Sequence, residues 1–151
     1  MNVSKWTQWT DIRIAAFGDR RLVGYGVYEI RAVTPNRKPI SINRVRASDP
    51  EGILYIGRSG FKSRSPLRTV ANRIKEFLGQ RHSGGITYAK ARDRLNRAPP
   101  FAGHTLEARA MFVPDKSIVF AERRVLAQYF AKYAELPPCN SSAGTRSKRG
   151  N

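Results

Sequence analysis

Two β-like runs, each carrying a tyrosine beside glycine-rich positions, constrain the fold of this chain more than any other feature. The first run extends from Leu22 to Val33 and contains Gly26-Val27-Tyr28. The second extends from Gly52 to Gly57 and ends in Tyr55-Ile56-Gly57. Side chains alternate along a strand, so Tyr28 is expected on the face opposite Val27. Two neighbouring strands would therefore hold two weakly acidic phenol hydroxyls.

The remaining pattern predicts three helices and one further strand. Ser65-Pro66 is expected to begin a helix, since serine caps helices and proline suits the first turn, and Gly79 is expected to end it. A strongly basic helix is expected over 86–97, a third strand over 105–113 and a last helix over 115–134. The order β-β-α-α-β-α predicts an α+β fold, with a three-stranded antiparallel sheet flanked by helices.

The chain has 151 residues, the length of a single domain. We expect an N-terminal arm over 1–20, one folded domain over 21–140, and a basic tail over 141–151. The tail is rich in small residues and is expected to be disordered. The segment 34–50 contains three prolines and is expected to form a loop or an irregular hairpin.

The charge of the chain indicates a polyanionic partner. It has 28 Lys and Arg residues against 11 Asp and Glu residues, a net charge of +17. Nucleic acid is the first candidate, ahead of an anionic membrane, because no basic helix has a wide apolar face. No apolar run approaches the roughly 18 residues that span a membrane. With no signal peptide evident and Cys139 the single cysteine, we expect a cytoplasmic, intracellular protein without a membrane partner.

Glu122 is the most informative acidic residue. It lies within the apolar stripe of the last predicted helix, between Ile118 and Val125. An ionised carboxylate there is costly unless it is compensated. The neighbours Arg123 and Arg124 point off that face. A bound divalent cation would compensate the charge, and a structural arginine partner is the alternative.

Arg73 lies beside the apolar stripe of the first predicted helix. An arginine in such a position often only covers apolar surface with its stem. A dense basic cluster surrounds it in the sequence: Arg58, Lys62, Arg64, Arg68, Lys75 and Arg81. Beside a buried carboxylate, such a cluster would suit a phosphate and its metal ion.

Taken together, these residues resemble the GIY-YIG nuclease superfamily. Gly26-Val27-Tyr28 is similar to its first motif, and Tyr55-Ile56-Gly57 matches the second letter for letter. Arg73 matches the arginine of the helix that follows, and Glu122 matches the metal-binding glutamate of the last helix. Asn140 is similar to the asparagine that often closes the pattern. The resemblance covers about residues 22–140.

The resemblance implies an endonuclease that hydrolyses phosphodiester bonds in double-stranded DNA with Mg²⁺ (or Mn²⁺), of restriction or mobile-element type. Glu122 would hold the metal ion. Tyr28 would act as general base or orient the attacking water, and Tyr55 would hydrogen-bond the phosphate or the water. Arg73 would stabilise the charge that develops on the phosphate. Asn140 would support the site.

The chain departs from the family pattern in two places. Twenty-seven residues separate Tyr28 from Tyr55, and the inserted segment would form a basic DNA-contacting loop. Four positions after the helical arginine, family members often have His or Tyr. This chain has Phe77, which cannot move a proton, and His82 from the following turn could substitute for it.

Specificity would come from the 34–50 loop, the 83–100 region and the N-terminal arm. The residues expected to contact DNA are Lys38, Arg44, Arg46, Arg58, Lys62, Arg64, Arg68, Arg81 and His82. Two other functions stay open: a non-catalytic nucleic-acid-binding module on the same fold, and an RNase. The oligomeric state also stays open, with a homodimer as one option.

Overall fold

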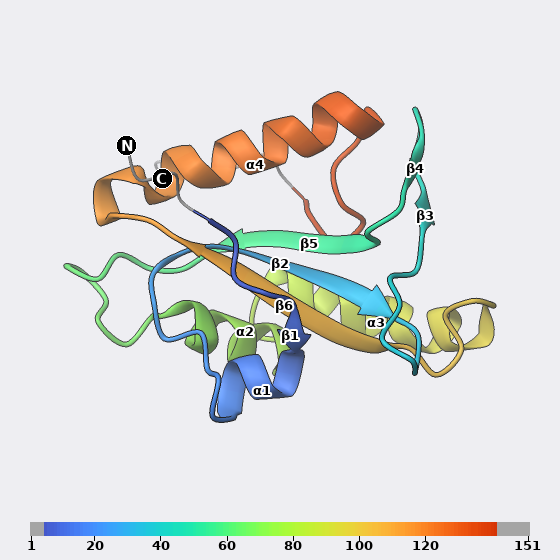
Figure 1. Cartoon of the computed structure of the whole chain (residues 1–151), viewed down its shortest axis with the longest axis horizontal. Helices are drawn as coiled ribbons and strands as arrows, with labels where there is room; N and C mark the ends of the chain where they lie inside the picture. The colour runs from blue at the N-terminus through green and yellow to red at the C-terminus, as the bar shows by residue number, and fades with distance from the viewer. Residues whose placement is uncertain (1–4, 142–151) are drawn as a thin grey trace, which may run out of the picture.

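A computed structural model describes residues 5–141 of the chain (Figure 1). The predicted basic tail over 141–151 lies outside the described residues, apart from Ser141. The elements in chain order are β1 Thr10–Asp11, α1 Ile12–Phe17, β2 Gly26–Val33, β3 Ile42–Asn43, β4 Ser48–Asp49, β5 Ile53–Arg58, α2 Val70–Leu78, α3 Ser83–Arg97, β6 Thr105–Phe112, a 3₁₀ turn Asp115–Ser117 and α4 Ile118–Tyr133. Helices and an antiparallel sheet make this an α+β fold, as predicted.

The main sheet has four strands and not the expected three. Its order is β1-β6-β2-β5, and every neighbouring pair is antiparallel. The fourth strand comes from the predicted N-terminal arm, where Thr10 pairs with Ala108 of β6. A two-residue strand has no periodicity of its own, so the sequence pattern could not show it. The strands β3 and β4 form a separate two-stranded sheet within the 34–50 segment.

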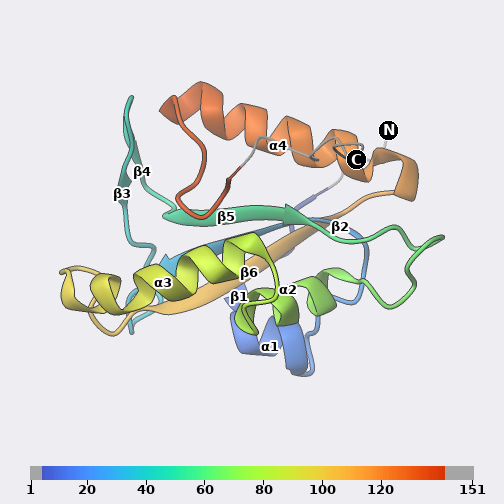
Figure 2. The same ribbon diagram turned by 180° about the vertical axis from the view of Figure 1, so that it is seen from behind.

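The helices lie in two layers on the main sheet. Helices α1, α2 and α3 cover one face, and α4 covers the other (Figures 1 and 2). Tyr28 and Ile30 of β2 belong to the core on the three-helix side, whereas Val27 belongs to the core under α4. The predicted alternation along β2 is confirmed. Pairing with β5 shifts between Ile30 and Arg31, because Leu54 has no opposite residue on β2.

Two helices begin at other residues than predicted. Helix α2 begins at Val70 and not at Ser65, because Thr69 is the N-cap and its Oγ1 accepts the Asn72 N–H (3.2 Å). Helix α3 begins at Ser83 and not at Ile86, so Gly84 and Gly85 belong to its first turn. Among the described residues, no helix is long and apolar enough to cross a membrane.

Candidate active site

The two motif tyrosines lie next to each other on adjacent strands. Their ring centroids are 5.9 Å apart, with the ring planes inclined by 53°. Gly57 is the residue opposite Tyr28 in the β2–β5 ladder. A Cβ atom at Gly57 would lie 2.7 Å from both the Tyr28 Oη and the Tyr55 Cε1. Glycine is therefore required there by the tyrosine pair itself.

The start of helix α3 packs directly on Tyr55. The His82 ring stacks on the Tyr55 ring at 5.4 Å and 25°, and its Nδ1 accepts the Gly85 N–H at 3.4 Å. A Cβ atom at Gly84 would lie 2.5 Å from the Tyr55 Cε2. The two glycines predicted a turn in the sequence, but they allow a helix to approach an aromatic ring closely. Sequence patterns carry no signal for such an approach.

Burial keeps both tyrosines protonated. The Tyr28 side chain is fully buried, and burial raises the pKa of its phenol well above the usual value of 10.0, with Tyr55 adding to the effect. Burial also raises the pKa of Tyr55. The positive charge of Arg73 opposes both shifts. Both hydroxyls are therefore hydrogen-bond donors at neutral pH.

The charges of Arg73 on α2 and of Glu122 on α4 act on the two tyrosines. Arg73 pairs with Glu76, and its charge acts on the tyrosines and on Glu122. Glu122 is 8% exposed, and burial raises its pKa while Arg58 and Arg73 oppose the shift. The Arg58 Nε lies 3.5 Å from the Glu122 Oε1. This ion pair is the arginine partner that the sequence left open, and the Glu122 Oε2 has no hydrogen bond or ion pair within residues 5–141.

Two buried polar atoms at this site lack a hydrogen-bond partner in the described part of the chain. They are the Tyr28 Oη and the His82 Nε2. Burial lowers the pKa of His82, and the Arg73 charge adds to that effect, so the ring is neutral at pH 7. Because Nδ1 accepts the Gly85 N–H, the proton of the neutral ring belongs on Nε2. The Tyr28 Oη and the His82 Nε2 can therefore both donate a hydrogen bond.

Asn140 supports the site from the edge of the sheet. Its Oδ1 accepts the Ile56 N–H (2.9 Å), and its Nδ2 donates to the Ile56 carbonyl (2.8 Å). The Cys139 N–H donates to the Leu54 carbonyl (2.8 Å). These bonds close the outer edge of β5, which has no further strand beside it. The amide of Asn140 thus holds the strand that carries Tyr55.

The predicted DNA-contacting residues divide into two groups. The first group belongs to the segments around the tyrosine pair. Arg58 is the last residue of β5. The other members are exposed and lie in the segments before α2 and α3: Lys62, Arg64, Arg68 and Arg81. The second group belongs to the 34–50 segment. There Arg44 pairs with Glu135 and donates to the Leu136 carbonyl (2.6 Å). Arg46 donates to the Ala131 carbonyl (2.8 Å), and only Lys38 of this group stays exposed without a side-chain bond in the described chain.

Glu122 is the residue that could hold a metal ion. Among the described residues there is no group of three or more His, Cys, Asp or Glu side chains arranged for a metal ion. Mg²⁺, however, commonly keeps several waters and binds one or two carboxylates together with substrate phosphates. A single buried carboxylate, with Arg58 on one of its two oxygens, could supply one such ligand.

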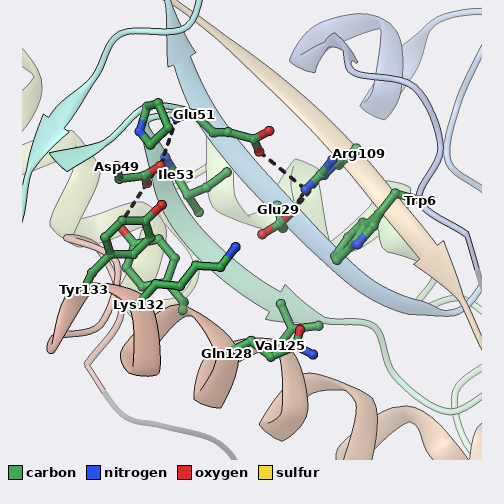
Figure 3. Close-up of a pocket in the computed structure, with 12 residues that line it drawn as sticks. Trp6, Glu29, Asp49, Glu51, Ile53, Arg109, Val125, Gln128, Lys132 and Tyr133 are labelled. Carbon is green, nitrogen blue, oxygen red and sulfur yellow. Dashed lines mark hydrogen bonds and ion pairs between the residues drawn. The ribbon is translucent and has the colours of Figure 1, made fainter. Parts of the chain in front are cut away.

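A second polar region, missed in the sequence, lies between the sheet and α4 (Figure 3). It surrounds a pocket of about 360 Å³. Arg109 of β6 pairs with Glu29 of β2 (2.6 Å), and Trp6 stacks on the guanidinium at 4.6 Å. Asp49 accepts the Tyr129 hydroxyl (2.9 Å). Glu29 lies directly opposite Arg109 in the β2–β6 ladder. The Glu29–Arg109 ion pair could be expected only once the register of these two strands was known, and that register comes from the sheet topology.

Comparison with models of known protein families, with curated proteins and with solved structures found no match.

Proposed function

We propose that this protein is a metal-dependent endonuclease of the GIY-YIG type that hydrolyses phosphodiester bonds in DNA. The observation that carries the proposal is the Tyr28–Tyr55 pair on β2 and β5, on which the charges of Arg73 from α2 and Glu122 from α4 both act. The strands β6-β2-β5 would be the family sheet, with β1 as an addition. Double-stranded DNA as substrate is supported by the +17 charge.

The side chains at the site suit phosphoryl chemistry. Glu122 would hold Mg²⁺ or Mn²⁺, which supplies Lewis-acid charge to a phosphate oxygen when bound. Arg73 and Arg58 would stabilise the negative charge that grows on the phosphate in the transition state. Asn140 would keep β5, and with it Tyr55, at a fixed distance from Tyr28.

The tyrosines would act as donors to the attacking water or the phosphate. A phenol with a raised pKa is a poor base at neutral pH, so the pKa of Tyr28 favours water orientation over proton abstraction. Tyr55, which is less buried, would donate to a phosphate oxygen. We place this activity in the cytoplasm, where the single thiol of Cys139 would stay reduced.

The test is incubation of supercoiled plasmid and linear phage DNA with the protein, in Mg²⁺ and in EDTA. Nicking or cutting in Mg²⁺ alone is expected. Glu122→Gln is expected to remove cleavage, whereas Glu51→Gln, an acid at the opposite pocket, is expected to keep it. Cleavage by Glu122→Gln at the wild-type rate would contradict the metal-binding role.

A non-catalytic DNA-binding module is the second candidate. It is favoured by the buried hydroxyl of Tyr28 and by Phe77, whose ring lies 5.7 Å from the His82 ring at a tilt of 58° and cannot transfer a proton. Tight DNA binding without metal-dependent cleavage would support this second function. A structured RNA as substrate in the same assay tests the RNase alternative, which requires RNA to be cut faster than duplex DNA.

A further inference from the structure

Helix α3 carries a stripe of basic side chains on its outer face. Lys90, Arg94 and Arg97 are spaced i, i+4 and i+7, which puts them on one side of the helix. All three are exposed. Gly84 and Tyr88, in contrast, lie on the side that packs against the rest of the domain. We call these three residues the α3 stripe.

The charges of the α3 stripe make no ion pair with another side chain in the part of the chain that the structure describes. Lys90 and Arg94 make no side-chain hydrogen bond or ion pair within residues 5–141, and Arg97 bonds only to the backbone carbonyl of Asp93 in its own helix. Asp93 is the single acidic residue of α3. Adjacent like charges without partners repel one another, so the stripe lowers the stability of the isolated helix. A polyanion would relieve that repulsion.

The arginines of the 34–50 segment are in the opposite situation. Arg44 and Arg46 bond to carbonyl groups at the C-terminal end of α4, where a cation also meets the negative end of the helix dipole. Arg37 forms paired hydrogen bonds to the Glu107 carboxylate (2.9 and 3.1 Å). These three guanidinium groups hold the β3–β4 hairpin to the domain. These guanidinium groups are already bonded within the protein in the absence of DNA.

The α3 stripe is continuous with the candidate active site. The helix starts at the Tyr55 ring, through His82 and Gly84, and runs away from it along the sheet (Figure 2). The distance along the axis from Lys90 to Arg97 is about 10 Å at 1.5 Å per residue. Phosphates of one DNA strand advance about 3.4 Å along the duplex axis per nucleotide. Three charges spread along α3 can therefore face consecutive phosphates of one strand.

We propose that the α3 stripe binds consecutive phosphates of one strand of duplex DNA, to one side of the bond that the candidate active site would cut. The proposal rests on the proposed function and names the surface that positions its substrate. It moves the main DNA contact from the 34–50 segment to α3. Phosphate contacts carry no sequence information directly, so the stripe sets the position and affinity of the DNA and not its sequence.

The experiment compares two double variants that lose the same charge. Lys90→Gln/Arg94→Gln removes two stripe residues, and Arg124→Gln/Lys132→Gln removes one arginine and one lysine from α4, on the other face of the sheet. All four positions are exposed and helical, and glutamine is a good helix former, so both variants should fold. Equal melting temperatures for the two variants and the wild type check this.

Binding to a labelled duplex of about 20 base pairs is measured by fluorescence anisotropy in EDTA, over a series of salt concentrations. Each lost phosphate contact removes about 0.9 from the slope of log K against log salt. The stripe variant should lose about 2 from that slope and bind more weakly by a similar factor on every sequence. The α4 variant should keep the wild-type slope.

The outcomes separate the stripe from the proposed function. Equal loss of slope in both variants, or none in the stripe variant, overturns the stripe and leaves the nuclease proposal standing. Stronger binding of duplex RNA than of duplex DNA overturns DNA as the partner of the stripe. Binding that depends on the stripe, with no metal-dependent cleavage, supports the stripe and overturns catalysis.

Discussion

The polar region under α4 and the candidate active site differ in how completely their buried groups are paired. Under α4, Glu29 pairs with Arg109, and Asp49 accepts hydrogen bonds from Tyr129 and from two backbone N–H groups (Figure 3). At the candidate active site, the Tyr28 Oη and the His82 Nε2 have no hydrogen-bond partner within residues 5–141, and Glu122 has only the Arg58 Nε at 3.5 Å.

Paired and unpaired buried polar groups have opposite effects on stability. A paired buried group adds to stability, whereas an unpaired one costs about 1–3 kcal/mol of desolvation. Native proteins keep few such groups, and each one needs an explanation. The described residues hold three such side-chain atoms, and two of them lie beside the tyrosine pair.

The sharpest test exchanges one buried acid from each region for its amide. Glu122→Gln should lower cleavage by at least about a hundredfold, because it removes the group proposed to hold the metal ion. Its melting temperature should change little, because the lost ion pair with Arg58 is offset by the burial that disfavours the charged carboxylate. Asp49→Asn should keep the site intact but lower the melting temperature, because the carboxylate accepts three hydrogen bonds. Plasmid nicking and thermal unfolding of both variants check the pair.

Two tyrosine hydroxyls give the next comparison. Tyr28→Phe should slow cleavage by about a hundredfold under single-turnover conditions and leave stability unchanged or higher, because its hydroxyl has no partner. Tyr129→Phe should lower the free energy of unfolding by about 1–3 kcal/mol, because Asp49 then loses its donor. Urea denaturation measures the stability of both. Full activity of Tyr28→Phe would remove this residue from the mechanism.

Replacing an arginine of the 34–50 segment should lower stability more than replacing an arginine of α3. Arg44→Ala should lower the free energy of unfolding by about 1–3 kcal/mol, since it breaks the bonds to Leu136 and Glu135. Arg94→Ala should change stability by less than about 0.5 kcal/mol, as usual for an exposed position. If Arg44→Ala leaves stability unchanged and alters which DNA sequences are cut, the hairpin arginine contacts bases.

The smallest expected effect is a pH dependence of stability from His82. Burial holds its pKa below the usual 6.5, so the unfolded chain binds this proton at a higher pH than the folded chain does. Stability should therefore fall as pH drops from about 6.5 toward the lower folded pKa. His82→Phe keeps the stacking on Tyr55 and should lose less stability between pH 7.5 and pH 5.5. Equal losses in both proteins would show that another group titrates.

Much of the fold followed from local patterns. The alternation along β2, the apolar stripes of α2 and α4, and the order of the long elements were all predicted. Strand β1 was missed because its two residues pair with β6, almost a hundred positions away in the sequence. The start of α3 was missed because Gly84 and Gly85 resemble a turn, and only the position of Tyr55 explains glycine there.

The sequence alone determined the pair of tyrosine motifs, the buried position of Glu122 on its helix and the surplus of positive charge. Periodicity and composition are local properties, so they can be taken from the chain directly. The tertiary structure decided which charges are free. Arg44 and Lys90 are both basic residues in polar segments, yet one bonds to Leu136, 92 positions later, and the other faces solvent. The partner of a side chain depends on which distant segments fold against it, and no local pattern encodes that choice.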